Sequence, residues 1–170
     1  SQSKPINLSL VNSSFKGIEL ANNGLLFMKY SPSNLENNFD QQISRVVVIA
    51  NNCLFTELTA NNGGVFYIEG VAKFFDLTVT ISNFQQINVN NGAIFHIQEV
   101  TTSATTKSSS RILASNFQTG NISLISNQFT NLSALNGGIL YEDTQNGTLA
   151  ILLEGSQIEN ITVLERGGIF

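Results

Sequence analysis

A short pattern that begins with Phe and ends in a Gly-containing apolar run recurs along this chain, and it constrains the fold more than any other feature. Four copies are clear, and a fifth carries one extra residue before its glycine pair. The copies are FKGIELANNGLLF (Phe15–Phe27), FTELTANNGGVFY (Phe55–Tyr67), FQQINVNNGAIFH (Phe84–His96), FTNLSALNGGILY (Phe129–Tyr141) and IENITVLERGGIF (Ile158–Phe170). Repetition at intervals of tens of residues is typical of a solenoid.

Each copy follows a short apolar or alternating run that reads as a strand. These runs are Ile6–Val11, Val46–Ala50, Leu77–Ser82, Ile122–Ser126 and Leu149–Leu153. Each repeat therefore reads as strand, Asn corner, strand, Asn-Gly corner and strand. This order predicts an all-β chain, a parallel β-helix of about five coils with three short strands each, which we expect to be right-handed.

Stacking the coils turns equivalent positions into columns inside the solenoid. Because adjacent coils lie about 4.8 Å apart, like side chains pack on like side chains. The first predicted column contains Phe15, Phe55, Phe84, Phe129 and Ile158. The second contains Ile18, Leu58, Ile87, Leu132 and Ile161.

Asparagine and glycine mark the predicted corners. Asn tolerates the left-handed backbone that a tight corner requires, and Gly adopts it at no steric cost. The first corner of each coil is predicted at Asn12, Asn51, Asn52, Asn83 and Asn127. The second is predicted at the glycines Gly24, Gly63, Gly64, Gly92, Gly137, Gly138, Gly167 and Gly168.

The spacing of the corners alternates between long and short. The markers Asn23, Gly63, Gly92, Gly137 and Gly167 give steps of 40, 29, 45 and 30 residues. The long steps contain polar, Ser/Thr/Asn-rich inserts, which we place at residues 30–45 and 99–120 on one edge of the solenoid. Residues 1–170 are expected to form one solenoid segment, without a polar or helical cap at either end.

The third strand of each coil is predicted from alternation alone. The inward positions would be Leu26, Met28, Phe66, Ile68, Ala93, Phe95, Ile97 and Leu140. The outward positions would be Leu25, Phe27, Val65, Tyr67, Ile94, His96, Ile139 and Tyr141. Such an outward apolar stripe is too long to stay in contact with water, so we expect the inserts or a neighbouring chain to cover it.

Composition excludes several classes of partner. Charged residues make up only 12% of the chain and the net charge is −4, without a run of Lys or Arg. A nucleic-acid partner is therefore not expected. No apolar run approaches the length of a membrane-spanning helix. Cys53 is the only cysteine, so no internal disulfide can form.

Candidate chemistry is sparse. The pairs Gly63–Gly64 and Gly137–Gly138 lack the Lys and the helix of a phosphate-binding loop. His96 is the only histidine and falls in a column of rings, so packing is favoured over metal binding. Glu69 and Asp143 share a column with Lys29 and Gln98, about 10 Å apart, near the separation in inverting polysaccharide-cleaving enzymes. We expect no enzymatic activity, no cofactor and no bound metal.

Six Asn-x-Ser/Thr sequences are candidate sites of N-glycosylation. They are centred on Asn7, Asn12, Asn121, Asn131, Asn146 and Asn160. Each becomes an acceptor if the chain passes through a secretory route. Asn7 alternates with inward-facing residues and should face solvent, whereas Asn121 and Asn146 are expected in loops.

The motif F-x-x-[LI]-x-x-x-N-G-[GA]-[ILV], present in this chain from Phe15 onward, resembles the repeats of polymorphic outer-membrane-protein-type and ciliate or protist β-solenoid surface proteins. The resemblance covers all five copies. It implies a secreted or surface-displayed solenoid with an adhesive or structural role, and it brings no enzymatic residues.

The expected function is therefore structural and non-enzymatic: an extracellular or cell-surface filament or fibre component that carries covalent glycans. Its coils would extend by end-to-end self-association or within a longer parent chain. Two alternatives stay open, an adhesin passenger domain and a carbohydrate-binding or polysaccharide-cleaving β-helix with its cleft along a strand face.

Overall fold

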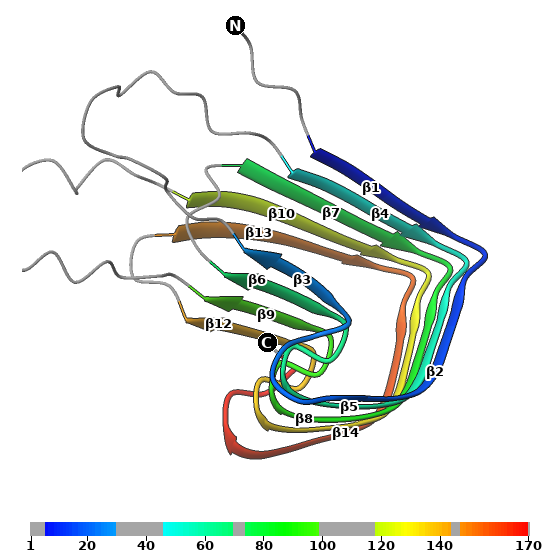
Figure 1. The fold of residues 1–170 in the computed structure, drawn as a ribbon, viewed down its shortest axis with the longest axis vertical. Helices are drawn as coiled ribbons and strands as arrows, with labels where there is room; N and C mark the ends of the chain where they lie inside the picture. The colour runs from blue at the N-terminus through cyan, green and yellow to red at the C-terminus, as the bar shows by residue number, and fades with distance from the viewer. Residues whose placement is uncertain (1–5, 30–45, 70–73, 99–117, 144–146, 170) are drawn as a thin grey trace, which may run out of the picture.

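A computed structural model describes residues 6–29, 46–69, 74–98, 118–143 and 147–169. All regular structure in these ranges is β-strand, and the strands stack in three parallel sheets (Figure 1). The first sheet contains β1 (Ile6–Val11), β4 (Val46–Asn51), β7 (Phe74–Thr80), β10 (Gln118–Ile125) and β13 (Gly147–Glu154). We call it sheet A.

The other two sheets complete each coil. Sheet B contains β2 (Ser14–Leu20), β5 (Leu54–Asn62), β8 (Asn83–Asn91), β11 (Gln128–Asn136) and β14 (Gln157–Arg166). Sheet C contains β3 (Leu26–Lys29), β6 (Phe66–Glu69), β9 (Phe95–Gln98) and β12 (Leu140–Asp143). The chain runs from sheet A to B to C and then starts the next coil, so the predicted parallel β-helix of five coils is confirmed. In the fifth coil, the described residues form the first two strands.

The pairing register confirms the first predicted column. Phe15 pairs with Phe55, Phe55 with Phe84, Phe84 with Phe129, and Phe129 with Ile158. The four rings stack nearly parallel, with centroids 5.2, 4.9 and 5.1 Å apart. The second column is also in register, from Ile18 through Leu58, Ile87 and Leu132 to Ile161. Both columns are fully buried in the middle coils and half-buried in the first and last.

The first corner of every coil, between sheets A and B, contains one residue with a left-handed backbone. These residues are Asn12, Asn52, Ile81, Ser126 and Gly155, with φ between 51° and 57°. The prediction was correct for Asn12 and Asn52. It was wrong for Asn51, Asn83 and Asn127, whose φ is not positive. The corner itself sets one left-handed position per coil, and the chain does not always place Asn there.

At the first corner, Ile81 takes the left-handed backbone at a cost in stability. It has φ 51° and its side chain is 64% exposed. A left-handed conformation crowds the Cβ atom and costs roughly 1–2 kcal/mol for a non-glycine residue, while Asn tolerates it. We expect Ile81→Asn to raise the free energy of unfolding by about 1 kcal/mol in denaturant titration. Ile81→Ala is the control, because it removes the exposed side chain but keeps a Cβ atom, and it should stabilise less. Equal gains from both variants would contradict backbone strain as the cause.

Each strand of sheet B bends at a second left-handed residue, which the sequence did not predict. These residues are Gly17, Glu57, Gln86, Asn131 and Asn160, with φ between 52° and 66°. The ladder pairing of each strand skips them. The bend lets the strands of sheet B wrap around the core (Figure 1). No residue type is common to the five positions, so the sequence carries no consistent signal for it.

The predicted corner glycines have two different roles. Gly63, Gly92, Gly137 and Gly167 have φ between 53° and 81°, as predicted. Gly24, Gly64, Gly138 and Gly168 do not have positive φ. At Gly64, an added Cβ would collide with the Ala93 carbonyl oxygen and lie 2.6 Å from Ile87 Cγ2. The second glycine is therefore required there by the close approach of the next coil.

The predicted outward stripe on the third strand is wrong in part. Val65, Ile94 and Ile139 are fully buried members of the hydrophobic core. They lie at the corner that precedes each strand, where the amides of both Val65 and Phe66 donate to the Ile94 carbonyl (3.3 and 2.8 Å). Strict alternation does not hold across this corner, so two consecutive side chains can point inward.

Side-chain hydrogen bonds join the coils at both corners. At the second corner, Asn136 Nδ2 donates to Asn91 Oδ1 and Asn91 Nδ2 donates to Asn62 Oδ1, both at 2.8 Å. At the first corner, the Cys53 amide donates to Ser82 Oγ (3.1 Å), and the Ser82 amide donates to Asn127 Oδ1 (2.9 Å). These ladders satisfy polar groups that would otherwise be buried without partners.

The two inserts lie largely outside the described residues, which resume at Gln118 after the second one. We predicted an insert at 99–120. Strand β10 begins at Gln118, so the last three residues of that range belong to the strand. The hand of the coil stays a prediction.

Candidate functional site

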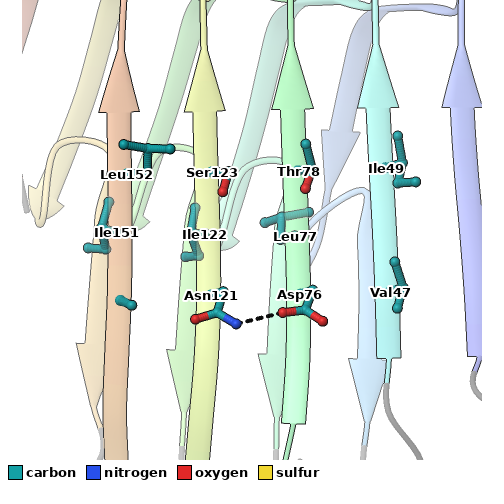
Figure 2. A pocket seen from close by; sticks show the side chains of 11 residues that line it. Val47, Ile49, Asp76, Leu77, Thr78, Asn121, Ile122, Ser123, Ile151 and Leu152 are labelled. Atoms are coloured by element: carbon teal, nitrogen blue, oxygen red, sulfur yellow. Dashed lines mark hydrogen bonds between the residues drawn. The ribbon is translucent and has the colours of Figure 1, made fainter.

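The outer face of sheet A carries a groove of about 540 Å³. Outward side chains such as Ile49, Thr78 and Ser123 line it, because alternate residues of a strand point away from the core. The lining also includes Leu77 and Ile122, whose side chains are buried in the core. Figure 2 shows the lining residues on β4, β7, β10 and β13. The lining residues are Val47, Ile49, Asp76, Leu77, Thr78, Asn121, Ile122, Ser123, Ala150, Ile151 and Leu152.

The groove has a polar centre between apolar margins. Thr78 and Ser123 are half-buried in its middle, on β7 and β10. Asn121 Nδ2 donates to Asp76 Oδ1 at 2.7 Å (Figure 2). Ile49 on β4 and Leu152 on β13 stand on either side and are 43% and 48% exposed. The groove can therefore contact both the apolar and the hydroxyl groups of a small amphipathic ligand.

Sheet C contains the column of polar residues that the sequence placed there. Lys29 pairs with Glu69, Glu69 with Gln98, and Gln98 with Asp143. Glu69 and Asp143 therefore occupy the same column two coils apart, as predicted. The side chains of Lys29 and Asp143 are outside the described set, so the separation of the two carboxylates stays a prediction.

A column of rings lies beside these polar residues. Phe27 stacks on Tyr67 with centroids 5.2 Å apart, and His96 lies between Tyr67 and Tyr141 at 4.9 and 5.2 Å. Tyr67 and His96 are each only 4% exposed, whereas Phe27 is 41% exposed. This enclosure between two rings supports a packing role for His96. In the described part of the chain, no group of three or more His, Cys, Asp or Glu residues is arranged to hold a metal ion.

The phenol of Tyr67, on this face, has a shifted pKa. Burial, and secondarily the negative charge of Glu69, raises the pKa of its phenol above 10.0. The phenol also donates to Gln98 Oε1 at 2.6 Å. A group that keeps its proton in the folded state contributes stability below its unfolded pKa, and that stability is lost as pH rises through the folded pKa.

We therefore expect the free energy of unfolding to fall above about pH 10, where tyrosine ionises in the unfolded chain. Denaturant titrations across this range would measure the fall. Tyr67→Phe, which removes the phenol, should reduce it. An unchanged pH profile in Tyr67→Phe would assign the alkaline sensitivity to other groups.

The candidate glycosylation sites are mostly at the surface. The side chains of Asn7, Asn12, Asn121, Asn131 and Asn160 are exposed, and Asn146 lies outside the described residues. Asn121 is within β10, not in the loop that we predicted, because the strand begins earlier than the sequence indicated. Asn160 Nδ2 donates to Asn131 Oδ1 at 3.1 Å, so these two sequons lie side by side on adjacent coils.

The groove on sheet A is the feature that sequence reasoning missed. Asp76 was not singled out, because nothing near it in the chain suggests a partner. Its hydrogen-bonding partner Asn121 is 45 residues away in sequence. The alternation of Leu77–Ser82 does show that Thr78 faces outward, but only the register places it beside Ser123.

The described residues include no helix with the length and apolar character needed to cross a membrane. Comparison of the chain with protein families, with curated proteins and with solved structures gives no match.

Proposed function

We propose that this chain is a structural, non-enzymatic β-solenoid of the extracellular space or cell surface, glycosylated and extended by the stacking of further coils into a rod or fibre. The added coils can come from a longer parent chain or from a second copy. The observation that carries the proposal is the continuity of the internal columns. Coils of different length keep their internal columns in register in all three sheets, and the one irregularity in the described pairing lies between Ala134 and Asn136, beyond the columns of sheet B.

The fifth coil offers a surface that supports this proposal. Ile151 and Leu153 are in register with the buried residues Ile122 and Leu124, yet each is 38% exposed. Strands β13 and β14 each pair on one side only within the described chain. A strand with one open side is a template for another parallel strand. A further coil that supplied the same columns would bury these side chains as the middle coils do.

The surface suits an extracellular role. The exposed sequons Asn7, Asn12, Asn131 and Asn160 lie on several coils and on two sheets. Attached glycans would make the sides of the rod hydrophilic and would leave the stacking faces free. Among the described residues that line the groove on sheet A, Asp76 is the one carboxylate, whereas a polysaccharide-cleaving site there would require two in one cleft.

Electron microscopy and fibre diffraction of native material test the proposal. We expect rods of constant width and an axial reflection near 4.8 Å, the spacing of stacked coils. Leu153→Asp, which puts a charge in an internal column, should shorten the rods. Leu152→Asp, on the outer face of the same strand, is the matched control and should leave their length unchanged. Compact particles of a single size in native material would refute the rod.

A further inference from the structure

One sequon lies inside the groove on sheet A. Asn121 and Ser123, the first and third residues of Asn121-Ile122-Ser123, are both lining residues (Figure 2). Both side chains point outward from β10, because they are two positions apart on one strand. The acceptor amide is therefore placed at the edge of a preformed depression.

The Asn121 amide has a fixed orientation. Its Nδ2 donates one proton to Asp76 Oδ1 at 2.7 Å, and the side chain remains exposed. An amide nitrogen carries two protons, so replacing the second by a sugar keeps this hydrogen bond. The hydrogen bond would then hold the attached sugar against the sheet.

The groove has the chemistry that an N-acetylated pyranose requires. A pyranose presents C–H groups on its faces and hydroxyl groups at its edge, and an N-acetyl group adds a methyl. Ile49 and Leu152 supply apolar side walls, and Thr78 and Ser123 supply hydroxyl groups between them. A volume of about 540 Å³ accommodates a small ligand of this kind.

We propose that Asn121 carries an N-linked glycan whose first N-acetylhexosamine lies in the groove on sheet A. The inference rests on the proposed extracellular function, because the sugar is attached in a secretory route. The donor is a lipid diphosphate oligosaccharide. A bond forms between Asn121 Nδ2 and the anomeric carbon, the bond from that carbon to the diphosphate oxygen breaks, and the lipid diphosphate leaves while Nδ2 loses one proton.

Asn7 provides a matched comparison within the same chain. It begins the sequon Asn7-Leu8-Ser9 and lies in the same outward column, since Asn7 pairs with Val47, Val47 with Asp76, and Asp76 with Asn121. Asn7 is exposed on the first coil and does not line the groove. A glycan at Asn7 would therefore extend into solvent, whereas the glycan at Asn121 would be partly covered.

The experiment treats the native, folded glycoprotein with an amidase that cleaves the Asn–glycan bond and follows each site by peptide mass. We expect release at Asn121 to be about tenfold slower than at Asn7, since the enzyme must first free the packed sugar. Unfolding the protein should remove the difference. Leu152→Ser and Ile49→Ser change only exposed walls and keep the sequon, so they should fold normally and accelerate release at Asn121 alone.

The outcomes separate this inference from the function on which it rests. Equal release rates at Asn7 and Asn121 in the folded protein would overturn the proposal that the sugar packs in the groove. A modified Asn7 beside an unmodified Asn121 would also overturn it and would leave the glycosylated solenoid intact. Native material without a glycan at any sequon would overturn both.

Discussion

Phe84→Ala is expected to lower the free energy of unfolding by about 3–5 kcal/mol, a large share of the stability of a domain of this size. Phe84 is fully buried, and its ring stacks between Phe55 at 4.9 Å and Phe129 at 5.1 Å. Truncation would leave a cavity in the middle of the column. Neighbouring coils could not close it without breaking the backbone ladders on both sides.

Two variants of the same column make the measurement specific. Phe15→Ala acts on the first coil, where the ring is half-buried and, among the described rings, stacks on Phe55 alone, so the loss should be smaller. Phe84→Leu keeps most of the volume and should cost less than Phe84→Ala. Equilibrium denaturation gives all three values. A loss at Phe84 no greater than at Phe15 would show that burial in the column does not determine stability.

Asn127→Ala should be comparably damaging, although it removes a polar side chain. Asn127 is 1% exposed, its Nδ2 donates to the Val79 carbonyl at 2.8 Å, and its Oδ1 accepts from the Ser82 amide at 2.9 Å. Removing the side chain deprives two buried backbone groups of these bonds. At about 1–3 kcal/mol for each, the expected loss is about 2–6 kcal/mol in denaturant titration.

The chain supplies both controls for Asn127. Asn127→Ser keeps an oxygen in the column where Ser82 and Ser156 already accept from the amides of Cys53 and Asn127, so it should recover part of the loss. Asn90→Ala removes an exposed amide that donates to Asn61 at 3.3 Å, and it should change stability by no more than about 0.5 kcal/mol. If Asn127→Ala were as mild as Asn90→Ala, the buried ladder would have no energetic role.

The contrast between Phe84 and Asn127 shows what periodicity can predict. The Phe column was predicted because a stacked solenoid needs the same shape at the same place in every coil, and the sequence repeats it. The hydrogen-bond ladder through Asn127 was not predicted, because Cys53, Ser82 and Ser156 meet the same hydrogen-bonding need with different side chains. Asn127 was assigned to the corner, whereas Ser126 takes the left-handed position and Asn127 points inward.

The prediction of side-chain direction and backbone conformation also failed at corners and bends. Alternation places side chains correctly only while the backbone stays extended, so it failed for Val65 at the corner before β6. The left-handed bends at Glu57 and Gln86 occur at residue types that have no strong preference for them. In each case the stacking of the coils determines the backbone, and local propensity is overridden.

By itself, the sequence determined the number of coils, the two apolar columns, the corner glycines and the positions of the candidate glycosylation sites. The columns and glycines depend on residues of one kind returning once per coil, and the glycosylation sites are local three-residue motifs. Only the tertiary structure decided that Asp76 holds the Asn121 amide and that a groove surrounds this sequon. The groove depends on the relative sizes of outward side chains on four strands. These strands come together only when coils of different length stack in register, because the backbone ladders of the sheets fix that register.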